Sequence, residues 1–62
     1  MDRIARAMRL RNTAEVVRAI AEDMQEGPRR TLLLEVARDY RERAHALEQE
    51  IRAGLRTRGN DQ

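Results

Sequence analysis

The chain is 62 residues long and forms at most one domain; 39% of its residues are charged, yet its formal net charge is only +2. It has no cysteine, which excludes disulfides, and a single histidine, which argues against a structural zinc site. Because so short a chain rarely buries enough apolar surface alone, the composition predicts self-association or a protein partner.

The first eleven residues form a basic, amphipathic segment with four arginines and one acidic residue. At about 100° per residue, one helical face carries Met1, Ile4, Ala5 and Met8, and it points away from the apolar face of the following residues. Two arrangements are therefore open. The chain bends near Asn12, where Glu15 completes a capping-box-like pattern, or one continuous helix turns its first apolar face toward another molecule.

The next stretch carries an apolar stripe with the spacing of an α-helix. Its residues follow steps of four, three, four and three, and large side chains alternate with alanines. The stripe consists of Leu10, Ala14, Val17, Ala21 and Met24, and Ala7 extends the alanine series backwards. We expect Gly27, in a left-handed conformation, to close this helix and Pro28 to begin another, so that the two helices fold back antiparallel.

A second and longer stripe dominates the rest of the chain. It again alternates large and small side chains at helical spacing. Its members are Leu33, Ala37, Tyr40, Ala44, Leu47, Ile51 and Leu55. This stripe predicts a helix over residues 28–56, with Thr31 as an alternative N-cap, followed by a disordered tail at 57–62. The matching alternation of the two stripes would let the helices approach closely.

These elements predict an all-α fold. Residues 12–56 form an antiparallel two-helix hairpin, with its turn near 27–28, that pairs with a second copy into a four-helix bundle. The twelve stripe residues are the predicted core and interface. More apolar residues lie beside the stripes than one hairpin covers, and they favour an interface beyond it. These residues are Val16, Ile20, Leu32, Leu34 and Val36.

No set of residues points to catalysis, a cofactor or a metal. His45 lies opposite the second stripe and far in sequence from any nucleophile, so we expect it to face solvent. Tyr40 is expected in the core, with its hydroxyl reaching the edge. We therefore predict a non-enzymatic protein that acts through protein–protein interaction or regulation, as a homodimer. The sequence contains no apolar run of about 20 residues, so we predict no membrane span. A bacterial cytoplasmic location is the default expectation.

The basic segment leaves two alternatives open. Its arginines, Arg3, Arg6, Arg9 and Arg11, are suited to contact the phosphates of RNA or DNA. The chain has no Phe or Trp to stack on bases, which argues against this function. The same short segment lacks the aromatic anchor of a membrane-surface helix. The other alternative is an antitoxin-like or adaptor subunit, whose leucine-rich end docks on a larger protein.

One stretch of the second helix resembles a motif of short uncharacterised proteins of alphaproteobacterial type. The motif has paired arginines, then Leu-Leu-x-x-Ala-x-x-Tyr, then alanine four residues on, and residues 29–44 follow it. Those proteins often have leucine three residues after the tyrosine, where this chain has Arg43. The resemblance implies a helical hairpin and no established activity. The seam of large and small residues is also similar to Rop-type RNA-binding hairpin dimers, a likeness of architecture alone.

Overall fold

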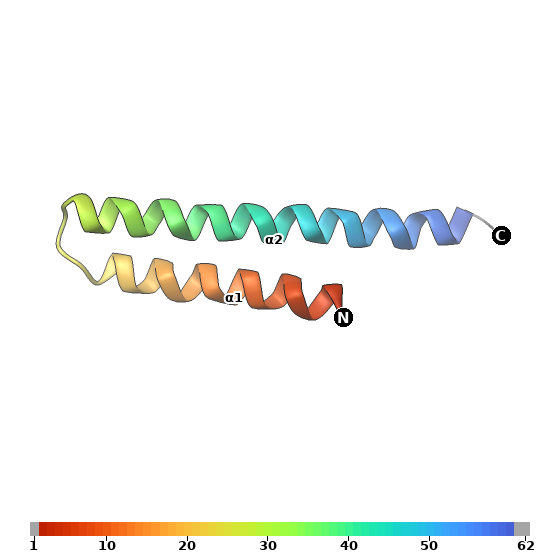
Figure 1. Cartoon of the computed structure of the whole chain (residues 1–62), viewed down its shortest axis with the longest axis horizontal. Coiled ribbons are helices and arrows are strands. Elements are labelled where there is room, and N and C mark those ends of the chain that lie inside the picture. The colour runs from red at the N-terminus through yellow and green to blue at the C-terminus, as the bar shows by residue number, and fades with distance from the viewer. Residues whose placement is uncertain (1, 61–62) are drawn as a thin grey trace.

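The computed structural model describes the backbone of residues 2–60 and the side chains of residues 2–55. It contains two α-helices, α1 (Arg3–Glu22) and α2 (Pro28–Asn60), and no strand lies within these described residues. The helices run antiparallel and lie against each other (Figure 1). This arrangement confirms the predicted all-α hairpin. The hairpin is elongated, with extents of 55 × 16 × 14 Å.

Helix α1 passes through the basic segment without a break. Asp2 is its N-cap, and the Asp2 carboxylate accepts a hydrogen bond of 3.0 Å from the backbone N–H of Ile4. Asn12 is exposed within the helix and caps nothing. Of the two arrangements left open by the sequence, the structure therefore shows the continuous helix, so the boundary at residue 11 separates no elements. The surrounding Ala, Arg, Leu and Met residues favour helix and carry it through Asn12.

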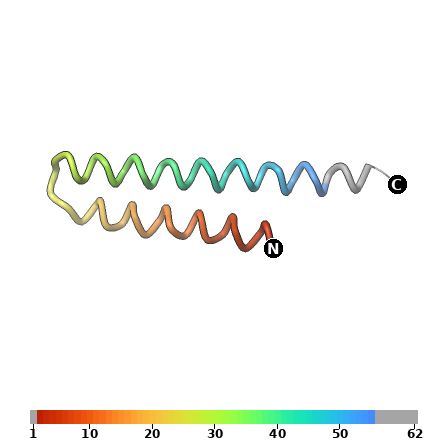
Figure 2. The backbone as a smooth tube through the Cα atoms, in the orientation of Figure 1, coloured from red at the N-terminus to blue at the C-terminus, as the bar shows by residue number. Residues whose placement is uncertain are grey.

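Residues 23–27 join the two helices in a short turn (Figure 2). The prediction of a left-handed Gly27 is wrong, because no residue in the described part of the chain has a positive φ angle. Helix α1 instead ends on Asp23, whose φ of −85° is right-handed. The Gly27 carbonyl accepts a hydrogen bond of 3.1 Å from the backbone N–H of Thr31. Thr31 therefore lies inside α2, which begins at Pro28 as predicted.

Helix α2 continues to Asn60, beyond its predicted end at residue 56. The backbone of residues 57–60, which the sequence predicts as part of a disordered tail over 57–62, is helical, and residues 61–62 lie outside the described part. No proline follows Pro28, and one internal glycine such as Gly54 costs a helix only about 1 kcal/mol. Nothing in the sequence therefore ends the helix earlier, and α2 extends past the start of α1 (Figure 2).

The core of the hairpin is a seam of alanines. Five of the described residues are buried, and all five are alanine: Ala7, Ala14, Ala21, Ala37 and Ala44. They recur every seven residues in each helix, so the small side chains face each other and let the backbones approach. The large stripe residues are only half-buried beside this alanine seam: Leu10, Val17, Met24, Leu33, Tyr40, Leu47 and Ile51. Burial thus follows the alternation of the two stripes, with the small residues buried and the large ones half-buried.

Leu55 is the one stripe residue that does not join the core. Its side chain is 61% exposed. Residue 55 lies near the open end of the hairpin, where α2 runs past the start of α1 (Figure 2). Leu55 therefore lies outside the core of a single hairpin, and its place in an interface stays a prediction.

Candidate interaction surface

The alanine seam divides the hairpin surface into two faces with different chemistry. Large apolar residues follow the seam alanines by three positions in both helices, as Val17 follows Ala14 and Tyr40 follows Ala37. Three positions correspond to about 60° of rotation to one side. Because the helices are antiparallel, this equal offset places both sets on the same side of the hairpin. We call this side the apolar face; it consists of Leu10, Val17, Met24, Leu33, Tyr40 and Leu47.

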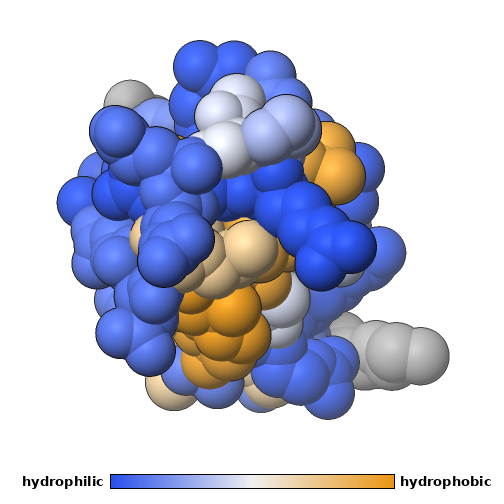
Figure 3. All heavy atoms as spheres, turned by 90° about the vertical axis from the view of Figure 1, so that its left-hand side faces the viewer, coloured by the Kyte–Doolittle hydropathy of each residue, from blue (hydrophilic) through white to orange (hydrophobic). Residues whose placement is uncertain are grey.

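The apolar face continues outward onto more exposed residues. Ile20 and Val36 each precede a seam alanine by one position, which places them further round on the same side. Ile20 is 52% exposed, and Leu32 near the loop is 59% exposed. A view onto the loop end shows apolar side chains at the surface among polar ones (Figure 3). The hairpin therefore leaves uncovered much of the apolar surface that its stripes present.

Arginines from both helices surround one end of the apolar face. An open depression there has a floor that includes Leu10 and Leu47, and its other lining residues are Arg3, Arg6, Arg43, Ala46 and Glu50. The guanidinium carbon of Arg43 lies 5.7 Å from the centroid of the Tyr40 ring, within reach of a cation–π interaction. Arg43 stands where the resembling proteins often have leucine, and it is exposed. It therefore borders the apolar face instead of extending it.

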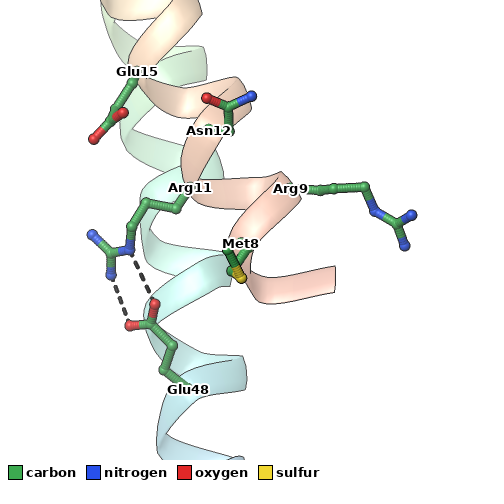
Figure 4. A pocket seen from close by; sticks show the side chains of 6 residues that line it. All are labelled: Met8, Arg9, Arg11, Asn12, Glu15 and Glu48. Carbon is green, nitrogen blue, oxygen red and sulfur yellow. Dashed lines mark hydrogen bonds and ion pairs between the residues drawn. The ribbon is translucent and has the colours of Figure 1, made fainter. Parts of the chain in front are cut away.

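The opposite face carries the one ion pair between the two helices in the described residues. Arg11 and Glu48 form a bidentate pair, with Nε to Oε2 at 3.0 Å and Nη2 to Oε1 at 2.7 Å (Figure 4). The hydrogen bond from Arg11 holds the pKa of Glu48 below its ordinary value. The Arg11 guanidinium, predicted as a possible contact for nucleic acid, is therefore already engaged within the hairpin.

The four predicted arginines do not form one surface. Arg9 is exposed and points away from the Arg11–Glu48 pair (Figure 4). Arg3 and Arg6 line the depression at the end of the apolar face. The structure therefore separates them into three directions around α1. Arg43 of α2 lines the depression with Arg3 and Arg6, and Arg41 of α2 lines another depression with Arg11.

A second interhelical contact ties the loop end together. The Nε of Arg30 donates a hydrogen bond of 3.1 Å to the carbonyl oxygen of Ala21. The same carbonyl also accepts a hydrogen bond of 3.1 Å from the backbone N–H of Met24, so Arg30 is an additional donor to it. The contact places a positive charge at the negative end of the α1 dipole. Neither this contact nor the Arg11–Glu48 pair was predicted from the sequence, because each depends on how the helices are aligned.

Ile4 and Met8 lie outside the apolar face. They are 55% and 66% exposed, and Met8 borders the same surface as Arg11 and Glu48 (Figure 4). The expectation that the first apolar patch of α1 points away from the hairpin core is therefore confirmed. His45 is exposed, as expected, and its Nε2 lies 3.3 Å from the Gln49 side-chain nitrogen.

Replacing Glu48 with glutamine is expected to lower the melting temperature slightly at neutral pH, and this difference should vanish in acid. Arg11 lowers the folded-state pKa of Glu48 from 4.5, so the folded chain takes up this proton less readily than the unfolded chain. The stabilisation is therefore present above about pH 4.5 and is lost as the pH falls through the lower folded-state pKa. Thermal unfolding followed by circular dichroism at about pH 7 and about pH 3 measures it.

The matched control is Glu42→Gln, which removes the same charge from another exposed position on α2. At neutral pH this control should leave the melting temperature close to that of the unchanged protein. If both variants lost the same stability with the same pH dependence, the Arg11–Glu48 pair would contribute nothing of its own.

Other kinds of site find no support in the described residues. No cluster of three or more His, Asp or Glu side chains lies there in a position to hold a metal ion. Neither helix has a segment long and apolar enough to cross a membrane, as far as the chain is described. Comparison with protein-family models, with curated proteins and with solved structures finds no match to this chain.

Proposed function

We propose that this chain is a small, non-catalytic protein that acts through protein–protein interaction or regulation, as a homodimeric helical bundle. The observation that carries the proposal is the composition of the core. All five buried residues in the described chain are alanine, whereas the six large side chains of the apolar face remain partly exposed. A large apolar side chain contributes about 1.5–3 kcal/mol when it is fully buried. The hairpin gains this contribution only when another surface covers the apolar face.

The total exposed area supports the same proposal. The chain exposes 5457 Å², whereas a compact monomer of this mass exposes about 4,100 Å². The difference exceeds the roughly 800 Å² that each partner contributes to a standard protein interface. One hairpin therefore has enough surplus surface for a stable association.

Sedimentation velocity tests the proposal directly. At micromolar concentration the chain should sediment as a species of twice the 7.2 kDa chain mass. Its helical content should fall on dilution, because the dimer and the folded hairpin stabilise each other. A monomer that stays fully helical on dilution would contradict the homodimer. In that case the adaptor or antitoxin-like role, with a larger protein on the apolar face, would be the better proposal.

One observation favours nucleic acid as a second candidate ligand. Arg3 and Arg6 of α1 meet Arg43 of α2 around one depression. This places three guanidinium groups from two helices within a small area, although Glu50 also lines it. Arginine side chains at such a site suit phosphate contacts that do not depend on base sequence.

Retention on immobilised RNA or DNA at low salt tests this second candidate. The triple variant Arg3→Gln, Arg6→Gln, Arg43→Gln is expected to lose the retention. The slope of log affinity against log salt should become flatter by about 2–3, because each lost phosphate contact removes about 0.9. The observation that contradicts this candidate is that the unchanged protein is not retained even at low salt.

A control variant separates the site from general charge. Replacing Arg29, Arg38 and Arg52 with glutamine removes the same total charge from positions outside the depression. This variant should keep most of the retention. Equal loss in both variants would indicate attraction by net charge alone.

A further inference from the structure

Charge is divided unevenly along the long axis of the hairpin. The open half contains the start of α1 and the facing part of α2, residues 2–16 and 41–55, and carries seven arginines and five acidic residues. The loop half, residues 17–40, carries four arginines and five acidic residues. The open half is therefore net positive and the loop half net negative.

The ends of the apolar face show the same division. At the open end, Arg3, Arg6 and Arg43 surround Leu10 and Leu47. At the other end, the turn exposes two acidic residues beside one exposed arginine, Arg29, whereas Arg30 is already bound to a backbone carbonyl of α1. The exposed acids of the turn are Asp23 and Glu26. A second copy that covers the apolar face must place its own charged ends close to the charged ends of the first copy.

We propose that a second copy covers the apolar face in the opposite direction, so that its loop half lies over the open half of the first. The inference rests on the proposed homodimer and adds to it the face that is buried and the direction of the copies. Two directions bury the same apolar face about a two-fold axis. With the copies parallel, both sets of open-end arginines meet, whereas with the copies opposed each set meets the acidic turn of the partner. Charge complementarity therefore selects the opposed direction.

The side chains of the apolar face fit this arrangement. They form three layers across the hairpin, with Leu10 beside Leu47, then Val17 with Tyr40, then Met24 with Leu33 at the loop end. The first pairing is seen in the depression that both leucines line, and the others follow from the antiparallel register. In a two-fold assembly of opposed copies, the middle layer lies at the axis and meets itself. Each end layer then meets the layer from the other end of the partner.

Distances between spin labels test the direction of the copies. The chain has no cysteine, so Gln25→Cys at the turn and Arg52→Cys in the open half each provide one label site. Both positions are exposed and lie outside the apolar face. Their distances along the axis from the middle layer are about 12 Å and about 18 Å, at 1.5 Å per residue. In opposed copies the two like labels should therefore be about 25–35 Å apart for Gln25→Cys and about 35–45 Å apart for Arg52→Cys.

A mixed dimer of the two single-cysteine variants is the matched control. With one label on each copy, the opposed direction brings Gln25→Cys near Arg52→Cys, at about 10–20 Å. The parallel direction predicts the reverse pattern, with short distances between like labels and a long distance in the mixed dimer. The double electron–electron resonance distances are read on samples whose mass has been measured by sedimentation.

The possible results distinguish this inference from the proposed function. Long distances between like labels with a short mixed distance support the opposed direction. Short distances between like labels in a dimer overturn the direction and leave the homodimer standing, and so does an equal mixture of both patterns. A monomeric mass without any distance between chains overturns the homodimer and the direction together.

Discussion

Replacing Ala44 with leucine is expected to lower the free energy of unfolding by about 1–3 kcal/mol, because the added atoms have no room in the seam. Ala44 is 0% exposed and lies in the alanine seam between the two helices. Alanine and leucine have similar helix propensities, so the expected loss reports packing between the helices. In a small protein this is a large part of the total stability. Urea unfolding followed by circular dichroism measures it.

The matched control is Ala19→Leu, the same change at an exposed alanine of α1. Surface substitutions of this kind usually change stability by less than about 0.5 kcal/mol. The urea midpoint of the control should therefore stay close to that of the unchanged protein. An Ala44→Leu variant as stable as the control would show that the seam has space to spare, which would contradict close packing of the helices.

Replacing Leu47 with aspartate is expected to weaken the proposed homodimer at least 100-fold. The half-buried Leu47 belongs to an end layer of the apolar face. Because the dimer is two-fold symmetric, one substitution removes this leucine from both copies. Completing the burial of one such side chain contributes about 1–1.5 kcal/mol to dimer formation, so its loss from both copies costs about 2–3 kcal/mol. Burying the introduced aspartate carboxylate in the interface adds a further cost. Sedimentation over a range of concentrations gives the dissociation constant.

Met8→Asp introduces the same charge at an apolar residue outside the apolar face, with 66% of the side chain already exposed. This control should leave the dissociation constant within a few-fold of its original value. Should both variants dissociate equally, the interface would not be confined to the apolar face. Should neither dissociate, the apolar face would not be the interface at all.

The two helices and their seam could be predicted because each rests on a repeated local pattern. Alternating steps of four and three place Ala14, Ala21 and Ala37 on helical stripes, and these residues are buried. The ends of the elements were less predictable. Asn12 is a good N-cap by residue type, yet it lies within α1, because a polar residue on the outside of a helix is also tolerated.

The contacts between the helices were beyond sequence reasoning for another reason. Glu48 has an arginine four residues on, at Arg52, and the helical spacing predicts that these two form a pair. The structure pairs Glu48 with Arg11, 37 residues away in the chain. Such a pairing depends on the alignment of one helix along the other, which no local pattern contains. The apolar face could be predicted only as a surplus of apolar residues, since its position follows from the same alignment.

The seven-residue repeat of the alanine seam has a consequence for how the helices find their alignment. If α2 slid along α1 by seven residues, Ala37 and Ala44 would again stand opposite alanines, so the seam by itself accepts more than one register. The five-residue turn limits such sliding at one end, where Arg30 also donates a hydrogen bond to the end of α1. The Arg11–Glu48 pair marks the correct alignment near the other end. A weak ion pair at the surface can thus select one alignment from several that bury the same alanines.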